Sequence, residues 1–174
     1  YLKQHHPKLT IGIADKNLSS DYLKEQEQFD IAIKTPGLKK NLVTILHTTA
    51  TNIFFSKMKG NNIIVGVTGS KGKSTTASLI FHILKSAKKD VVFLGNIGNP
   101  MLEELMKPVA KGRVYILELS SYQLDDIQFS PDIAVVTNLF PEHMTYHGGL
   151  KNYYNAKKNI INFQSFHFIT FLRN

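Results

Sequence analysis

The chain has 174 residues, of which 43% are hydrophobic and 20% charged, a composition typical of a globular protein with one good core and room for part of a second domain. It has no Cys, which excludes disulfides and thiolate metal sites, and no apolar run reaches the ~18 residues that a membrane span needs. The formal net charge is +8, but the lysines are scattered along the chain, so we expect solvated surface lysines rather than a nucleic-acid interface.

The first 60 residues are expected to form part of a small α/β unit. The predicted elements are strands at 9–14, 31–34 and 41–46 and helices at 19–29 and 51–58. A polar turn that contains Gly60 follows at residues 59–62 and marks the expected boundary with the next domain.

From residue 61 onward, predicted strands alternate with helices. The strands lie at 63–67, 91–94, 114–119 and 133–137, and the helices at 75–87 and 150–163. The strands are continuous apolar runs, as in parallel strands that are covered on both faces. The first helix is expected to bury one apolar stripe, made of Leu79, Ile80, Ile83, Leu84 and Ala87. This alternation predicts an α/β fold built on a right-handed parallel sheet.

The segment after the first of these strands has the layout of a phosphate-binding loop. Gly69 and Gly72 let backbone N–H groups converge on an anion, and the helix that follows adds its positive end. Lys73 supplies a charge for the outer phosphates, and the Ser74 hydroxyl can bind Mg²⁺. Val67 stands where the strict pattern has Gly, so the loop is a variant. The alternative, an accidental Gly-rich turn, would not explain why strand, turn and helix all fall where the mechanism needs them.

Polar residues close the other strands, and the carboxyl ends of parallel strands meet at one edge of the sheet. Glu118 ends an apolar strand, where an unpaired carboxylate is costly, so it is either a Mg²⁺ ligand or a capping or ion-paired glutamate. His143 follows the last strand and binds a second cation or substrate, or is a structural histidine. His147, His5 and His6 have no such context and are expected at the surface.

Lys157 lies in the middle of the apolar stripe of the last predicted helix. A lysine at such a position either extends its amine to solvent or points inward for a function. Burial lowers the pKa of an amine, and a neutral amine can react with CO₂ to give a carbamate. Spacing alone favours the first alternative.

Taken together, these segments resemble the Mur ligases. The matching pieces are the loop 66–76, Gly95-Asn96-Ile97-Gly98, Glu118-Leu119-Ser120-Ser121-Tyr122-Gln123-Leu124, residues 138–143 and Tyr153 with Ala156-Lys157. Thr35-Pro36-Gly37-Leu38 is similar to a motif of the family's first domain. The resemblance covers about residues 9–164 and is strongest for the branch that adds D-glutamate to UDP-N-acetylmuramoyl-L-alanine in peptidoglycan synthesis. Thr145 departs from an aspartate common in the family, and residues after Gln164 do not resemble it.

The resemblance implies ATP and two Mg²⁺ ions as cofactors, and a role for each matching residue. The implied nucleotide-binding residues are Gly69, Ser70, Lys71, Gly72, Lys73, Ser74 and Thr75. The implied metal ligands are Ser74, Glu118, His143 and Lys157 as a carbamate, and the implied substrate-binding residues are Asn96, Ser120 and His143. The implied catalytic residues are Lys73, Glu118, His143 and Lys157. This match favours an inward Lys157, against the expectation from spacing.

The resemblance also implies an activity and a domain organisation. ATP would phosphorylate the substrate carboxylate, and the amine of D-glutamate would attack the acyl phosphate. Residues 1–60 would be part of a Rossmann-like UDP-substrate-binding domain and 61–174 part of the ATP-binding domain. The start of the first domain and the whole C-terminal domain are expected to be absent, so the chain alone is not expected to catalyse ligation. We expect a cytoplasmic monomer with small-molecule partners only. A non-catalytic nucleotide-binding remnant and a sister ligase, such as a folylpolyglutamate synthase, are the alternatives.

Overall fold

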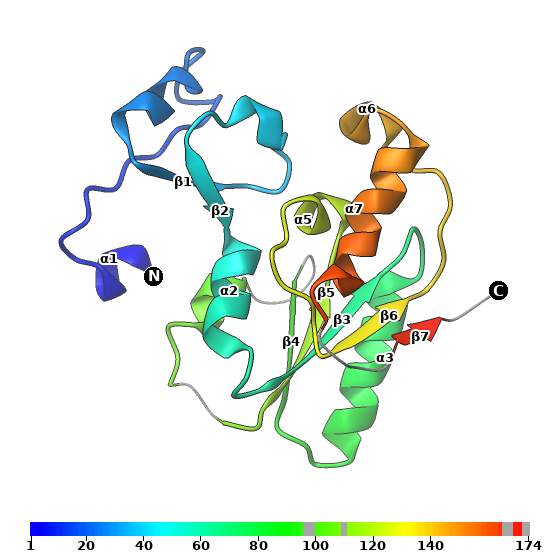
Figure 1. Cartoon of the computed structure of the whole chain (residues 1–174). Coiled ribbons are helices and arrows are strands. Elements are labelled where there is room, and N and C mark those ends of the chain that lie inside the picture. Colours follow the sequence, from blue (N-terminus) through cyan, green and yellow to red (C-terminus); the bar gives the residue numbers. More distant parts are fainter. Residues whose placement is uncertain (96–99, 109–110, 165–168, 172–174) are drawn as a thin grey trace.

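The computed structural model describes residues 1–95, 100–108 and 111–164 and the backbone of 169–171 (Figure 1). The strands are β1 (Ile31–Lys34), β2 (Leu46–Thr49), β3 (Ile63–Thr68), β4 (Val91–Gly95), β5 (Val114–Glu118), β6 (Ile133–Val136) and β7 (Ile169–Phe171). The α-helices are α1 (Leu2–His5), α2 (Ala50–Met58), α3 (Lys73–Ser86), α4 (Met101–Glu104), α5 (Ser121–Asp125), α6 (Met144–His147) and α7 (Leu150–Asn162). Two short 3₁₀ helices are η1 (Lys24–Gln28) and η2 (Lys40–Leu42).

The main sheet is parallel throughout, with the strand order β4-β5-β3-β6-β7. Its central strand β3 pairs Val67 with Glu118 of β5, which is also paired with Gly95 of β4. On the other side, β3 pairs Val67 with Val135 of β6. The carboxyl ends of these four strands are therefore level, which confirms the predicted convergence at one edge of the sheet.

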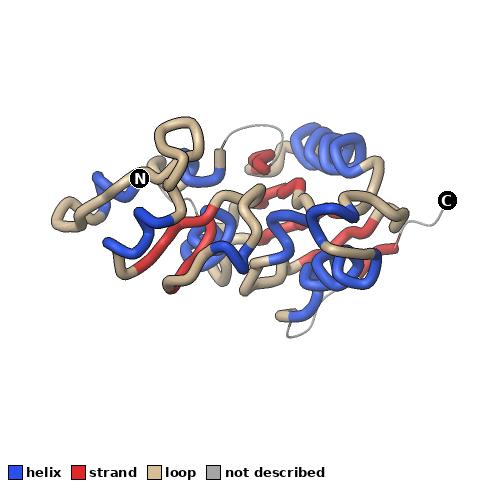
Figure 2. The backbone as a smooth tube through the Cα atoms, turned by 90° about the horizontal axis from the view of Figure 1, so that it is seen from above, coloured by secondary structure: helices blue, strands red, loops and turns tan. Residues whose placement is uncertain are grey.

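Helices cover both faces of this sheet (Figure 2). On one face, Phe54 and Phe55 of α2 and Ile160 of α7 pack in a buried cluster with residues of β3, β4, β5 and β6. On the other face, Ala77 of α3 packs with Val65, Val67, Ile116 and Val135. A fully buried apolar side chain of this size contributes roughly 1.5–3 kcal/mol, so these two clusters hold the layers together. The predicted α/β architecture is confirmed.

The chain before α2 forms a small unit beside the main sheet (Figure 1). Its strands β1 and β2 pair in parallel, with Ile31 opposite Leu46. Thr49 ends β2 and caps α2, since its side chain accepts a hydrogen bond of 3.1 Å from the Asn52 N–H. β2 thus leads directly into a helix of the main core.

Several predicted elements of this first unit are wrong. Residues 9–14, all of them described, form no strand, and every one of them is exposed. The helix expected at 19–29 is reduced to η1. The strand expected at 41–46 is η2 followed by β2, which begins only at Leu46, because pairing with β1 sets where it starts. A β-strand is stable only when it pairs with a neighbouring strand, and the local sequence does not show whether such a neighbour is present.

The predicted elements after residue 50 are confirmed to within two residues, but two details differ. Leu79 and Ile83 of α3 are each 59% exposed and Ala87, which follows the helix, is also exposed, while Ala77, Ile80 and Leu84 face the sheet. The buried stripe is narrower than expected, since the helix contacts one flat layer only. β7 was not predicted, and pairs with β6.

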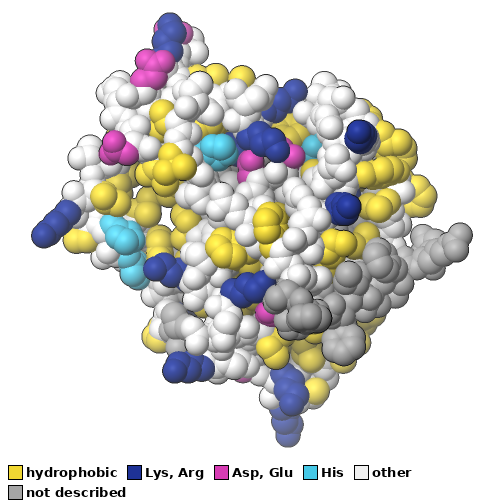
Figure 3. Space-filling model, in the orientation of Figure 1, with side chains coloured by type: hydrophobic (Ala, Val, Ile, Leu, Met, Phe, Trp, Pro, Cys, Tyr) yellow, Lys and Arg dark blue, Asp and Glu magenta, His cyan; other side chains and the backbone are white. Residues whose placement is uncertain are grey.

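The surface carries dispersed charge. On the face shown in Figure 3, Lys and Arg side chains are spread over the molecule rather than gathered in one patch. Within the described residues, no helix is both long and apolar enough to cross a membrane.

Candidate functional site

The loop between β3 and α3 depends on two glycines. Gly69 has a φ of +148°, and a Cβ at this position would collide with the Thr137 hydroxyl. Gly72 has a φ of +80° and is the N-cap residue of α3. Both conformations are ones that L side chains rarely adopt. The backbone thus curls around the start of α3, whose first N–H groups have no intrahelical acceptor and can bind an anion.

Hydrogen bonds tie this loop to the segment after β6 and to α7. The Ser70 hydroxyl bridges the Phe140 backbone N–H and carbonyl, both at 2.8 Å, and the Tyr153 hydroxyl at 2.7 Å. The Lys71 N–H donates to Asn138 Oδ1 at 2.8 Å, and the Ser70 N–H donates to the Asn138 carbonyl at 2.9 Å. Ser70 and the Lys71 N–H are therefore committed within the protein. Phosphate oxygens would be met instead by Lys73 and by the first turn of α3, which includes Ser74 and Thr75.

Two lysines meet at the carbonyl oxygen of Gly69. Lys73 Nζ donates to it at 3.0 Å and to the Ser70 carbonyl at 2.8 Å. Lys157 Nζ reaches the same Gly69 oxygen from α7 at 2.7 Å. Lys157 is only 3% exposed, so its amine points inward, and the expectation from spacing that it extends to solvent is wrong. Burial, and to a lesser extent the charge of Lys73, lowers the pKa of Lys157 from 10.5 to about 8.

Glu118 at the end of β5 supplies a carboxylate to the same edge. It is 2% exposed, and its Oε2 atom has no hydrogen-bond partner among the described residues. A buried carboxylate oxygen without a partner is costly, and a divalent cation would satisfy it. No three His, Asp or Glu side chains of the described part of the chain converge as ready-made metal ligands. A cation here would therefore need phosphate oxygens, water, Ser74 or a modified Lys157 to complete its shell.

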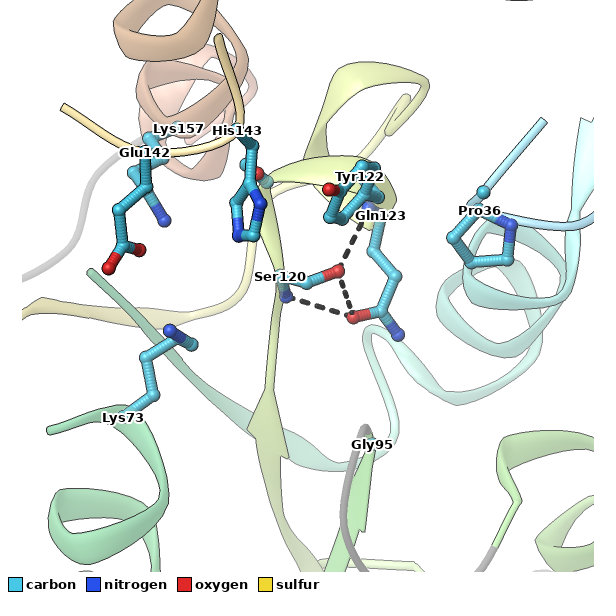
Figure 4. Close-up of a pocket in the computed structure, with 11 residues that line it drawn as sticks. Pro36, Lys73, Gly95, Ser120, Tyr122, Gln123, Glu142, His143 and Lys157 are labelled. Atoms are coloured by element: carbon cyan, nitrogen blue, oxygen red, sulfur yellow. Dashed lines mark hydrogen bonds between the residues drawn. The ribbon is translucent and has the colours of Figure 1, made fainter. Parts of the chain in front are cut away.

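A pocket of about 570 Å³ lies at this edge of the sheet (Figure 4). It is lined by Pro36, Gly37, Lys73, Gly95, Ser120, Ser121, Tyr122, Gln123, Glu142, His143 and Lys157. Figure 4 shows Lys73, Glu142 and Lys157 pointing toward the same space, with Pro36 of the first unit on the opposite side. The pocket thus combines residues of both parts of the chain. Asn96, a predicted substrate-binding residue, lies outside the described residues.

Ser120 and His143 occupy the pocket wall in different ways. The Ser120 side chain caps α5, since it accepts from the Gln123 N–H at 3.2 Å while the Gln123 side chain accepts from the Ser120 N–H at 2.9 Å. His143 has a φ of 55°, an uncommon conformation for a residue other than Gly, and its ring lies 4.9 Å from that of Tyr122. Ser120 is thus engaged at the start of α5, whereas the His143 ring packs against Tyr122 at the pocket wall.

Sequence reasoning missed two residues here. His147 was expected at the surface but is buried, with its Nε2 3.0 Å from the Ser121 hydroxyl, and burial lowers its pKa. Its signal was the spacing of four residues from His143, which places both on one side of a helical turn. Glu142 points into the pocket, and only its position beside His143 marked it in the sequence.

Comparison with known proteins agrees with this geometry. Residues 67–173 match the family described as Mur ligase middle domain. The chain is 38% identical over 154 residues to a UDP-N-acetylmuramoylalanine–D-glutamate ligase of Clostridium acetobutylicum, which covers 85% of this chain and 33% of that protein. It is 56% identical over 97 residues to a UDP-N-acetylmuramoyl-L-alanine–L-glutamate ligase of Salinispora tropica, covering 56% of this chain and 20% of that protein.

Solved structures share the fold. The structure of MurF ligase from Thermotoga maritima in complex with ADP aligns with a TM-score of 0.54 at 20% identity, over 88% of this chain and 39% of that one. The chain spans about a third of the length of the Clostridium relative. The family match extends over more than half of the chain, and the phosphate loop, the buried lysine and the level strand ends all lie within the matched residues. The chain belongs to the Mur ligase family.

Proposed function

We propose that the chain is part of an ATP-dependent ligase that joins D-glutamate to UDP-N-acetylmuramoyl-L-alanine in peptidoglycan synthesis. One observation carries the proposal: Lys73, Lys157 and the unpartnered Glu118 carboxylate occupy one edge of the sheet, at a phosphate loop beside a pocket. The Clostridium relative bears the name of this activity. Residues 1–60 would take part in binding the UDP-linked substrate, and residues 61–174 in binding ATP, in a monomeric cytoplasmic enzyme.

The chemistry follows from the charges at this edge. A carboxylate oxygen of the substrate attacks the γ-phosphorus of ATP, ADP leaves, and an acyl phosphate forms. The nitrogen of D-glutamate then attacks the acyl carbon, phosphate leaves, and the amide forms. Lys73 would exchange its contacts with the Gly69 and Ser70 carbonyls for the outer phosphates. Mg²⁺, held by Ser74 and Glu118 and, in a second site, by His143 and Lys157, would neutralise charge on the phosphates. Ser120, His143 and Asn96 would contact the substrate.

We infer that Lys157 acts as a carbamate. The neutral amine attacks CO₂, and the new N–C bond forms with loss of one proton, which leaves an anionic oxygen ligand. A pKa of about 8 gives a sizeable neutral fraction near neutral pH. Incubation with ¹³C-bicarbonate should give a carbamate ¹³C signal that disappears in Lys157→Gln and persists in Lys158→Gln, whose side chain is exposed. A signal that survives in Lys157→Gln would rule out this role.

Ligand binding by the chain itself tests the proposed function. Calorimetry should detect binding of Mg-ATP that is lost in Lys73→Ala, and binding of UDP-N-acetylmuramoyl-L-alanine that is retained in this variant. Binding of Mg-ATP without binding of the UDP-linked substrate would reject the ligase and leave a nucleotide-binding module.

A second candidate is the addition of L-glutamate, which the 56% identity to the Salinispora tropica relative favours. Incubations of a longer enzyme that contains these residues and the C-terminal domain, with ATP, Mg²⁺, UDP-N-acetylmuramoyl-L-alanine and one glutamate isomer at a time, distinguish the two by the mass of the product. Product from L-glutamate alone would identify the second candidate.

A further inference from the structure

The turn at Thr35–Leu38 brings the first unit to the pocket. It closes with a hydrogen bond of 3.2 Å from the Leu38 N–H to the Thr35 carbonyl, and Pro36 and Gly37 at its tip line the pocket. The carbonyls of Thr35, Pro36 and Leu38 all accept hydrogen bonds from side chains, which come from Lys34 and Tyr146. These side-chain hydrogen bonds to three carbonyls hold the turn more firmly than its single backbone hydrogen bond would alone.

Lys34, the last residue of β1, binds the turn through its side chain. Its Nζ donates to the Leu38 carbonyl at 2.6 Å and to the Thr35 carbonyl at 3.2 Å, and it lies 2.6 Å from Asp126 Oδ2. The Lys34 and Asp126 side chains are 0% and 6% exposed, so this ion pair is buried. The Asn52 side chain in turn donates to the Asp126 carbonyl at 2.8 Å and accepts from the Gln128 N–H at 2.9 Å. Asn52 of α2 therefore holds the backbone at Asp126, and the Asp126 carboxylate forms an ion pair with Lys34.

Tyr146 of α6 binds the same turn through its side chain. Its hydroxyl, on α6, lies within donor distance of the Pro36 carbonyl at 3.0 Å and of the Leu38 carbonyl at 3.3 Å. Burial, together with the charges of Asp125 and Asp126, raises the pKa of Tyr146 to about 12, so the hydroxyl keeps its proton throughout the physiological range. His143, which lines the pocket, is the N-cap residue of the same short helix. Helix α6 therefore fixes the position of the turn through Tyr146 and begins at His143, so the turn and His143 are held by the same helix.

Gly37 at the tip of the turn is not required by the fold. Its φ lies outside the left-handed region, and a Cβ built on it would meet no heavy atom of the described residues within 4 Å. Gly60 also has open space around a Cβ, but a positive φ of +91° explains that glycine. At Gly37 the missing side chain leaves bare backbone facing the pocket, which fits close approach of a ligand.

Buried ion pairs are an inefficient way to stabilise a protein, because desolvation of both charges offsets most of their attraction. Exposed contacts nearby already attach the first unit to the rest of the molecule. Lys40 Nζ lies 3.4 Å from Asp125 Oδ1, and Lys39 Nζ donates to the Thr145 carbonyl at 3.3 Å. The buried Lys34–Asp126 pair differs from these exposed contacts, because Lys34 also binds two carbonyl oxygens of the Thr35–Leu38 turn. We therefore interpret the pair as fixing the position of this turn beside the pocket.

We propose that Lys34, Asp126 and Tyr146 form a clamp that fixes the Thr35–Leu38 turn against the pocket, and that these positioning residues thereby set the affinity for the UDP-linked substrate. The second half of this statement rests on the proposed function. The clamp does not touch the phosphate loop, so it should leave nucleotide binding unchanged.

Tyr146→Phe tests the clamp with little risk to folding, since it removes one hydroxyl and keeps the ring that packs on Tyr122 at 4.4 Å. Tyr154→Phe is the matched control, because Tyr154 is a half-buried tyrosine of α7 that does not line the pocket. Hydrogen exchange of the free chain is followed by mass spectrometry in peptides that cover residues 35–38 and β3. Calorimetry then measures the Kd of each variant for UDP-N-acetylmuramoyl-L-alanine and for Mg-ADP.

We expect Tyr146→Phe to speed exchange at residues 35–38 and to raise the Kd for the UDP-linked substrate, each by roughly three- to tenfold, with no change in β3 or in the Kd for Mg-ADP. Tyr154→Phe should change neither. Unchanged exchange at residues 35–38 would reject the clamp, whatever the ligand data show. Faster exchange with an unchanged Kd would reject the link to substrate affinity. A wild-type chain that does not bind the UDP-linked substrate would contradict the proposed function, and the exchange data would still decide the clamp.

Discussion

Gly69 and Gly37 both lie beside the pocket, but for different physical reasons. Gly69 needs a φ of +148° and has no space for a Cβ, whereas Gly37 has an ordinary φ and open space. We expect Gly69→Ala to lower the free energy of unfolding by roughly 2 kcal/mol or more, because strain and collision add. Gly37→Ala should leave it unchanged or raise it by up to about 1 kcal/mol, because Ala restricts the unfolded chain.

Urea denaturation of the two variants measures this difference, and calorimetry adds a second contrast. Gly37→Ala should fold normally and still bind the UDP-linked substrate less tightly, because it adds a methyl group to a residue that lines the pocket. Equal losses of stability in both variants would show that the turn at Gly37 is strained in a way that its backbone conformation does not indicate.

His147 gives the molecule a pH dependence whose sign follows from burial. Burial lowers its pKa in the folded state below the ordinary 6.5, so between those two values the unfolded chain binds more protons than the folded one. Stability therefore rises with pH up to about 6.5, and this contribution is lost as the pH falls through the lower folded pKa. His147→Gln should reduce the slope of unfolding free energy against pH in this window.

The exposed His82 on α3 offers the matched control. His82→Gln should keep the wild-type slope. If both variants reduced it equally, the acid sensitivity would come from the general charge of the molecule rather than from the His147–Ser121 contact.

At the level of elements, the Lys34–Asp126 pair joins the end of β1 to the end of α5. Lys34→Met removes the lysine partner of the buried Asp126 carboxylate and leaves the more distant His47 Nε2, at 3.7 Å from Oδ1, which should cost about 3 kcal/mol of unfolding free energy. The combined variant Lys34→Met with Asp126→Leu should cost much less, because it removes both charges. Lys40→Met breaks only the exposed pair with Asp125 and should cost about 0–1 kcal/mol.

Urea denaturation of the wild type, Lys34→Met, Asp126→Leu and the combined variant forms a double-mutant cycle, with Lys40→Met as the exposed control. A combined variant as unstable as Lys34→Met alone would mean that hydrogen bonds from Lys34 to the turn, rather than its charge pairing, stabilise this junction.

At the level of the whole molecule, stability is expected to be uneven. Among residues 1–49, only Lys34 and Thr49 are buried, whereas α2, β3, β5 and β6 contribute most of the buried residues of the two apolar clusters. Segments with few buried contacts open at low free-energy cost. Limited trypsin digestion should therefore cut first before β1 and leave a resistant core that begins near α2 and still binds Mg-ATP. Cuts that appear first within β3 to α7 would contradict this distribution.

How far the sequence alone predicts this molecule depends on the range of the interactions. Strands β3, β5 and β6 of the main sheet were predictable because they are largely buried on both faces and therefore read as continuous apolar runs, whereas β7 was not predicted. The phosphate loop was predictable because its glycines, Lys73 and Ser74 are local. By contrast, the strand expected at 9–14 failed because none of the strands in the described part of the chain pairs with it. Beyond the phosphate loop, site residues could be located from the local sequence where they end a strand, as Glu118 does. The burial of His147 against Ser121 and the contact of Lys34 with Asp126 depend on how helices dock, which no local pattern records.

The hydrogen bonds of the phosphate loop have a consequence for biosynthesis. The loop residues leave the ribosome early, but their partners Asn138, Phe140, Tyr153 and Lys157 are translated some 70 to 90 residues later. β3 likewise waits for β5 and β6 before either of its edges is paired. The nascent chain must therefore carry β3 with unpaired edges until β6 has emerged, and a phosphate loop that lacks some of its hydrogen-bond partners until α7 has emerged. Because the phosphate loop is incomplete until then, we expect bound nucleotide to stabilise only the later stages of folding.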